Sequence, residues 1–439
     1  LVGRIVALIM TGRAKISSIA AITFTELAAA ELKERVRSRL LSRVETFGLP
    51  DTEKDLCRAA IRGFDSASIQ TLHSFAGQLL RERPLDIGLP PPFDVVESIE
   101  ADINFQNRWE TWLDETLDSE SAAPVLGRAM GLGLRLDQLR RIAVSFYERY
   151  DLLNTPFPVL SPPNPAAVQG IIDARCQILS LIRLAHYEDD PLAVHAKKIV
   201  RFGQRLEAIG AATDMALATL SRYGSFSVNR GRISDWDEDP ETGKNGCTAL
   251  KSVLKNLEDL KTDELVASRS SIICELSENI RELAKKYAYE RLQAGKLEFQ
   301  DLLVLARNLL RDKEEAREYF QQRFTHILID EFQDTDPIQA EIAVLLGRSI
   351  SRKQNGSTDL LPGKLFVVGD PKQSIYRFRG ADISVSEQLK KIIPDGQLSL
   401  TQNFRSQQPI ISWLNSLFEK WMNDDALCTG EVEYRAISA

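Results

Sequence analysis

The most constraining feature of this sequence is a short apolar run that ends in two acidic residues. The stretch HILIDEFQDTDPIQ places Ile327, Leu328 and Ile329 directly before Asp330 and Glu331. Such a run predicts a buried strand of a parallel sheet, with the two carboxylates at its carboxyl end. Ligands of parallel sheets bind at this edge, so the pair predicts a site for a magnesium-bound nucleotide. The alternative is a pair of acids that only caps the following turn.

The residues after this pair favour the interpretation as a site. Gln333, Asp334 and Gln339 are polar at positions where a helix would normally bury something apolar. A phosphate-binding loop of the type G-x-x-x-x-G-K-[ST] would be the expected companion of the two acids, and none occurs in the 439 residues.

The rest of the chain indicates an α/β fold with helices on both faces of a parallel sheet. Helical segments repeatedly follow strand-like segments, which is typical of such folds. Leu27, Leu32, Val36 and Leu40 are expected to share one face of the first long helix. Strands or strand–helix pairs are expected within 17–45, 67–83, 296–310, 326–348, 364–370 and 397–421, where 397–403 is a strand.

The character of the chain changes between about 94 and 290. Amphipathic helical segments dominate there, among them 103–117, 136–150 and 271–293, and strand signals are scarce. Loops rich in proline, glycine and aspartate separate these helices. We expect a mainly helical insertion into the α/β fold.

Composition narrows the class of protein. The formal net charge of −7 argues against a protein that coats nucleic acid by bulk electrostatics, although it leaves room for a local channel. The five cysteines are far apart and form no C-x-x-C pair, which predicts reduced thiols without zinc or disulfides. No apolar run approaches the length of a membrane span. These features predict a cytoplasmic protein.

A second motif, VVGDPKQSIYRFRGADIS, combines a strand end with an interleaved run of rings and guanidinium groups. The Gln373 amide is placed to sense a terminal phosphate. Tyr376 and Phe378 alternate with Arg377 and Arg379, a pattern that suits base stacking together with phosphate contacts. The alternative is an amphipathic edge with both rings in the core, and the pattern alone favours it.

Three weaker signals complete the set of candidates. In TQNFRSQQPI, Arg405 is placed to reach a phosphate and Phe404 offers a ring to an adenine, although a structural arginine is the simpler interpretation. Phe24 and His73 lie where expected strands meet helices, so backbone amides there are suited to nucleic-acid phosphates. Most such phenylalanines belong to the core, and most lone histidines are structural.

Taken in order, six segments resemble superfamily 1 DNA helicases of the UvrD/Rep type, most closely the RecB/AddA branch of exonuclease V-type helicase–nuclease subunits. The resemblance implies a RecA-like motor domain in two parts, 1–93 and 291–395, interrupted by a helical insertion at 94–290 and followed by the start of a second motor domain at 396–439. The segments are TFTELAAAELKERV, TLHSFA, LEFQDLL, ILIDEFQDTDPIQ, VVGDPKQSIYRFRGADI and LTQNFRS.

The resemblance also assigns roles around the nucleotide. Asp330 corresponds to the magnesium-organising aspartate and Glu331 to the catalytic base. Gln373 corresponds to the sensor of the γ-phosphate, and Arg405 to the arginine of the second motor domain that contacts it. Phe404 takes the adenine-stacking place often held by tyrosine.

A second group of residues is implied to line a track for single-stranded DNA. The resemblance places Phe24, His73, Tyr376 and Phe378 there, and the interleaved pattern adds Arg379. Phe378 stands where UvrD-like members commonly have tryptophan, which weakens the expected stacking.

The implied activity is ATP-driven translocation along single-stranded DNA in the 3′ to 5′ direction, with duplex unwinding. ATP and Mg²⁺ are the implied cofactors, DNA is the implied substrate, and a second helicase–nuclease polypeptide is a candidate partner. In the family the phosphate loop directly precedes the helix that LVGRIVALIM predicts, so we interpret the chain as an inactive fragment that also lacks the later motor motifs and any nuclease domain. The alternative is a degenerate, non-catalytic module that binds DNA or a partner.

Overall fold

The computed structural model describes residues 1–158, 166–210, 213–240, 242–349, 360–393, 396–422 and 436. The chain divides into two compact units. Unit 1 comprises Leu1–Val96 and Leu292–Ala439, and unit 2 comprises Glu97–Arg291. Among the described residues, no helix is both long enough and apolar enough to cross a membrane.

Unit 1 contains a four-stranded sheet in the order β2-β1-β5-β6, and all of its strand pairs are parallel. The expected α/β fold with a parallel sheet is therefore confirmed. The inner strands β1 and β5 are almost entirely buried, whereas β6 is half-buried along its length. The strands are β1 (Ile19–Thr23), β2 (Ser68–Thr71), β5 (His326–Ile329) and β6 (Leu365–Val367).

The register of these strands brings their carboxyl ends to one level. Thr23 at the end of β1 lies opposite Thr71 at the end of β2. Ile329 at the end of β5 lies opposite Ile22 on one side and Val367 on the other. Segments that are far apart in the sequence therefore leave the sheet side by side.

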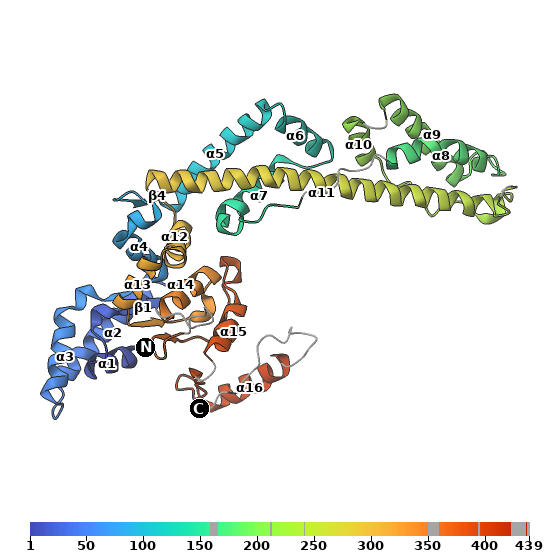
Figure 1. Cartoon of the computed structure of the whole chain (residues 1–439). Coiled ribbons are helices and arrows are strands. Elements are labelled where there is room, and N and C mark those ends of the chain that lie inside the picture. The colour runs from blue at the N-terminus through green and yellow to red at the C-terminus, as the bar shows by residue number, and fades with distance from the viewer. Residues whose placement is uncertain are drawn as a thin grey trace. The chain divides into compact units, whose positions relative to one another are not determined.

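Both faces of the sheet are covered by helices (Figure 1). Ile19, Ala21 and Leu328 pack with α1, α2 and α3 in one hydrophobic core. Because successive strand residues face opposite sides, the buried Ala20 and Ile22 belong to the other face, where α4, α12 and α14 pack. The bounds are α1 (Val2–Met10), α2 (Glu26–Glu45), α3 (Asp51–Arg62), α4 (Leu72–Glu82), α12 (Phe299–Asp312), α13 (Glu314–Arg323) and α14 (Pro337–Gly347).

A short parallel pair marks the point where the chain leaves and re-enters unit 1. Strand β3 (Asp94–Val95) pairs with β4 (Lys296–Leu297). The amide of Asp94 donates to the Gly295 carbonyl, and the amide of Val96 donates to the Leu297 carbonyl. This pair joins the two halves of unit 1 at this point, in addition to the pairing of β1 with β5.

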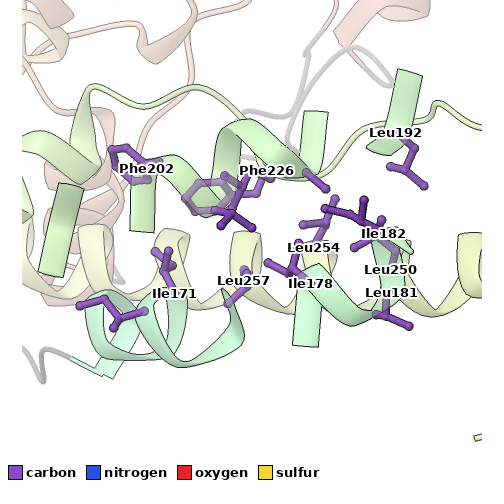
Figure 2. Close-up of a cluster of buried hydrophobic side chains, with 14 of the residues drawn as sticks. Ile171, Ile178, Leu181, Ile182, Leu192, Phe202, Phe226, Leu250, Leu254 and Leu257 are labelled. Atoms are coloured by element: carbon purple, nitrogen blue, oxygen red, sulfur yellow. The ribbon is translucent and has the colours of Figure 1, made fainter. Parts of the chain in front are cut away.

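Unit 2 is helical and is organised along the 49-residue helix α11 (Figure 1). One apolar cluster joins the first half of α11 to α8, α9 and α10, with Phe226, Leu250 and Leu254 among its members (Figure 2). A second cluster joins the later half of α11 to α5, α6 and α7. The bounds are α5 (Ser98–Asp118), α6 (Ala122–Gly131), α7 (Leu136–Glu148), α8 (Ala166–Ile182), α9 (Pro191–Ile209), α10 (Asp214–Ser221) and α11 (Gly246–Ala294).

Two expectations from the sequence are wrong. Leu27 is 80% exposed rather than buried with Leu32, because five residues at 100° each place it about 140° away around the helix. The expected strand at 397–403 is absent, with only an isolated bridge at Gln402. A single segment gains no ladder of hydrogen bonds without a neighbouring strand, so propensity alone does not form one. Helices α15 (Ile383–Ile392) and α16 (Gln408–Met422) flank it.

Candidate functional site

The segment after β5 is held between the ends of two neighbouring strands. The amide of Asp330 donates a hydrogen bond of 2.9 Å to the Ile22 carbonyl at the end of β1. On the other side, the amide of Val368 donates to the Ile329 carbonyl, and the amide of Phe332 donates to the Val368 carbonyl, both at 2.9 Å. The predicted acidic pair therefore lies at the middle of the carboxyl edge of the sheet.

Asp330 and Glu331 have different environments although they are adjacent. Burial raises the pKa of Asp330 above its ordinary value, and the neighbouring charge of Glu331 raises it further. Glu331 is exposed, and its φ of 51° is the one positive φ of a non-glycine residue in the described part of the chain. Such a conformation costs roughly 1–3 kcal/mol and persists only where its surroundings hold it.

A buried amide connects Glu331 to the loop that follows β6. Gln333 is only 3% exposed. Its Nε2 donates to Glu331 Oε2 at 2.7 Å, and its Oε1 accepts the amide of Asp370 at 2.9 Å. The carboxylate of Glu331 is therefore tied through one side chain to the loop that carries the second predicted motif.

That loop forms a tight turn at the strand end. Asp370 begins the short 3-10 helix Pro371–Gln373, and its Oδ1 accepts the amide of Lys372 at 3.1 Å. Gln373 is exposed, and its Nε2 donates to Asp370 Oδ2 at 3.0 Å. The predicted phosphate-sensing amide is thus in the loop that Gln333 fastens to Glu331.

Three predicted rings form a contiguous group beside this loop. The ring centroids of Phe24 and Tyr376 are 4.8 Å apart, and those of Tyr376 and Phe378 are 5.9 Å apart. Phe24 and Tyr376 are half-buried, whereas Phe378 is 78% exposed. The alternative that placed both rings of the motif in the core is therefore wrong for Phe378, because most of that side chain faces solvent.

His73 belongs to a separate group at the end of β2. Its ring makes an edge-to-face contact with Phe299 at 5.9 Å, and burial lowers its pKa, which favours the neutral imidazole. Both rings line a cavity of about 640 Å³. Glu26 Oε1 accepts hydrogen bonds from the hydroxyls of Thr71 and Ser74, so the segments that carry Phe24 and His73 are fastened to one another.

Comparison with known proteins identifies the family of the chain. A family profile described as "UvrD/REP helicase N-terminal domain" matches residues 1–394. The chain belongs to this family. The resemblance inferred from the ordered motifs is confirmed.

Individual relatives agree with this assignment. The chain is similar to proteins named as subunits of an ATP-dependent helicase/nuclease from Pediococcus pentosaceus, with 24% identity over 99% of the chain, and from Listeria monocytogenes, with 27% identity over 94% of the chain. A protein of the same name from Streptococcus sanguinis is 26% identical over 99% of the chain. The chain spans 36–38% of the length of these three relatives.

The remaining predicted residues of the UvrD/REP-type site are not brought to the carboxylates. Phe404 is 88% exposed and Arg405 is exposed. In the described residues, no hydrogen bond or ion pair joins the Arg405 guanidinium to Asp330 or Glu331; the Asn403 side chain instead accepts the backbone amide of Arg405 at 2.9 Å. The side chain of Arg379 lies outside the described part of the structure.

Two contributors to the site had no assigned role at the level of sequence. Gln333 was recognisable only as a polar residue at a position suited to an apolar one, and one of its two side-chain hydrogen bonds depends on a loop 37 residues away. Phe299 follows a short strand in LEFQDLL, and no local pattern indicates that its ring meets His73. The first partnership follows from the pairing of β5 with β6, whereas the second joins segments that follow strands of two different sheets.

Asp330 fits a role in holding Mg²⁺. Burial and the neighbouring Glu331 both penalise its negative charge, and a cation there would relieve both effects. Mg²⁺ typically uses one or two protein carboxylates, keeps several waters and takes substrate phosphates as its other ligands. Accordingly, the absence of any group of three or more acidic, histidine or cysteine side chains suited to a metal, as far as residues are described, is compatible with a magnesium–nucleotide site.

Proposed function

We propose that this chain is the nucleotide- and DNA-binding part of an ATP-driven DNA translocase and helicase that moves 3′ to 5′ on single-stranded DNA. The observation that carries the proposal is the strained, exposed Glu331 beside the half-buried Asp330, tied by Gln333 to the loop of Gln373. The family match and the names of the relatives support the same interpretation.

In this proposal the carboxyl edge of the sheet holds the nucleotide. Mg²⁺, when bound, would neutralise phosphate charge, and Asp330 would hold it through a water molecule. Glu331 accepts the proton of the attacking water, because its carboxylate is exposed at the site. The exposed amide of Gln373 donates to the terminal phosphate, and Arg405 reaches that phosphate when a second motor domain closes, with Phe404 stacking on the adenine.

DNA bases lie against the rings of Phe24, Tyr376 and Phe378 in the proposed track, with His73 further along and Arg379 contributing a guanidinium group. Stacking on rings is tolerant of base sequence, as a translocase requires. Unit 1 then corresponds to a RecA-like motor domain followed by the beginning of a second one, and unit 2 corresponds to the helical insertion. Because the relatives are named as subunits, a second helicase–nuclease polypeptide is the proposed partner, and the cysteine pattern supports a cytoplasmic location.

The chain by itself should hydrolyse ATP poorly, because its 439 residues contain no G-x-x-x-x-G-K-[ST] sequence to cradle the phosphates. This observation also favours a second candidate function, a non-catalytic module that binds DNA or a partner protein. The two candidates differ in what a longer form of the protein, one that includes such a phosphate-binding loop, can do.

Strand displacement tests the proposal. The longer form is given ATP and Mg²⁺ with duplexes that carry either a 3′ or a 5′ single-stranded tail. We expect unwinding of the 3′-tailed duplex only. Unwinding of the 5′-tailed duplex alone would contradict the direction, and binding of DNA without ATP-dependent unwinding of either substrate would favour the non-catalytic module.

A further inference from the structure

Gln333 stands out because its buried side-chain amide is bonded through its nitrogen to one candidate site segment and through its oxygen to another. Its nitrogen donates to Glu331 Oε2 at 2.7 Å and its oxygen accepts the amide of Asp370 at 2.9 Å. An amide is uncharged and has a donor and an acceptor at opposite corners of one plane. A carboxylate would lack the donor, and an apolar side chain would lack both groups.

The loop after β6 is pressed against Gln333 closely enough to require a glycine. A Cβ atom at Gly369 would lie 2.7 Å from Gln333 Oε1 and 3.1 Å from the backbone nitrogen of Phe332. Further along, the hydroxyl of Ser374 donates to the backbone carbonyl of Gln333 at 3.2 Å. The loop is therefore fastened to Gln333 at its beginning and at its end.

The same loop leads directly into the rings of the proposed DNA track. Tyr376 follows Ser374 by two residues, and its ring lies 4.8 Å from Phe24 at the end of β1. A displacement of the loop by bound DNA would change the hydrogen bonds that Ser374 and the Asp370 amide make with Gln333. Through the Gln333 amide it would reach the carboxylate of Glu331.

We propose that Gln333 is a positioning residue that sets the orientation of the Glu331 carboxylate according to the position of the 369–376 loop, and so makes ATP hydrolysis dependent on DNA. The inference rests on the proposed function, since it takes Glu331 as the base. It goes beyond that function by assigning the coupling of the two sites to one amide, which bonds the Glu331 carboxylate on one side and the loop on the other.

Two substitutions separate the parts of this connection. Gln333→Met has a similar length and removes both hydrogen bonds. Gln333→Glu keeps the acceptor for the Asp370 amide but removes the donor to Glu331. It also adds a negative charge next to Glu331, which already lies near the carboxylates of Asp330 and Asp334. Gln322→Glu on the exposed surface of α13 adds the same charge elsewhere in unit 1 and serves as the control.

The experiment measures ATP hydrolysis by the longer form, with and without single-stranded DNA, together with hydrogen exchange at the Asp370 amide. Loss of a side chain that orients a reacting group typically lowers activity about 10- to 100-fold. We expect Gln333→Met to lose this much of the DNA-stimulated kcat with little change in KM for ATP, and to exchange the Asp370 amide faster. Gln333→Glu should keep Asp370 protected but lower the DNA-stimulated kcat relative to Gln322→Glu, because it removes the hydrogen-bond donor to the Glu331 carboxylate.

The results distinguish failure of this inference from failure of the proposed function. If the unsubstituted protein hydrolyses no ATP, the proposed function fails. Hydrogen exchange then tests the link between Gln333 and the loop by itself. Equal protection of the Asp370 amide in the unsubstituted protein and in Gln333→Met would refute this link. If the unsubstituted protein is active, wild-type kcat and DNA stimulation in Gln333→Met would refute the positioning role. Equal DNA-stimulated kcat in Gln333→Glu and Gln322→Glu would also refute it.

Discussion

The two units differ in where backbone strain and close approach occur. In unit 2, two apolar clusters that the surrounding helices complete account for most buried positions along α11, with Lys261 and Glu264 buried between them in sequence. In unit 1, the carboxyl edge of the sheet buries the amide of Gln333, gives Glu331 a strained backbone and requires a glycine at 369 for close approach. Apolar packing explains the first pattern, whereas the strained backbone of Glu331 costs stability.

This difference indicates where chemistry is located. A strained residue or a buried polar side chain persists only where the surrounding structure holds it, and strained residues cluster at functional sites. Substitutions at the edge of unit 1 should therefore change activity with little effect on stability. Substitutions in the core of unit 2 should change stability with little effect on activity per folded molecule.

The largest expected effect is on catalysis. In the longer form, Glu331→Gln should keep binding of magnesium-ATP but lower hydrolysis by roughly 10²- to 10⁴-fold, since removal of a general base has this effect. The melting temperature should change little, because Glu331 is exposed. Wild-type turnover by this variant would show that Glu331 has a structural role and is not the catalytic base. It would also remove the contrast between the two units.

The counterpart in unit 2 is a large effect on stability. Leu254 is 1% exposed within the cluster around α8, α9 and α11 (Figure 2). Leu254→Ala should lower the free energy of unfolding by about 2–5 kcal/mol in urea titrations, through lost transfer energy and a residual cavity. Leu260→Ala, at a leucine 42% exposed on the same helix, should cost about 0.5 kcal/mol or less. Hydrolysis per folded molecule should be unchanged in both, and a selective loss in Leu254→Ala would contradict the division of roles.

Lys364 shows that a buried charge in unit 1 need not belong to the site. It directly precedes β6 at the opposite end of the sheet, is 6% exposed and donates from Nζ to the Gln321 carbonyl at 2.7 Å. Burial lowers its pKa from 10.5 to about 8. Between these values the unfolded chain binds more protons, so the free energy of unfolding should rise with pH across pH 8 to 10.5, by about 3 kcal/mol in total.

Replacement of this lysine sharpens the test. Lys364→Met should abolish the rise in the free energy of unfolding between pH 8 and 10.5 and leave catalysis unchanged. Unfolding is followed by urea titration at several pH values. Parallel pH dependences for the wild-type protein and the variant would show that burial does not govern the titration of Lys364.

The smallest expected effects concern the rings of the proposed DNA track. Tyr376→Ala and Phe378→Ala should each weaken binding of single-stranded DNA by about 1–3 kcal/mol, whatever the base sequence. A core phenylalanine would instead cost about 3–5 kcal/mol of stability, and the 78% exposure of Phe378 argues against such a loss. Phe47→Ala, at a fully exposed ring beyond α2, is the control. Lost stability with unchanged DNA affinity per folded molecule would overturn the stacking assignment.

Sequence reasoning succeeds where a local pattern determines the structure. The run from Ile327 to Ile329 predicted both strand β5 and the position of the carboxylates, because burial on both faces of a sheet leaves a continuous apolar signal. Of the 49 residues of α11, only 271–293 were predicted to be helical. The two apolar clusters lie on different stretches of the helix, so its buried residues do not follow one helical period along its whole length. The strand expected at 397–403 failed because strand formation depends on a partner rather than on propensity alone.

Contacts between distant segments could not be predicted in the same way. The hydrogen bond from the Asp370 amide to Gln333 and the tilted ring contact between Phe24 and Tyr376 depend on which strands are neighbours and on their register. Neither quantity is encoded in a single local pattern. The family resemblance supplied candidate roles for Phe24 and Tyr376 but none for Gln333, and the geometry adds how these segments are connected.

The central claim is that the carboxyl edge of unit 1 is an ATP site whose activity requires a phosphate-binding loop absent from the 439 residues. The most direct measurement is the rate of ATP hydrolysis with and without single-stranded DNA, for the chain alone and for the longer form. We predict little DNA-stimulated hydrolysis by the chain and robust hydrolysis by the longer form. Robust turnover by the chain alone, or a longer form that binds DNA but remains inert toward ATP, would contradict the claim.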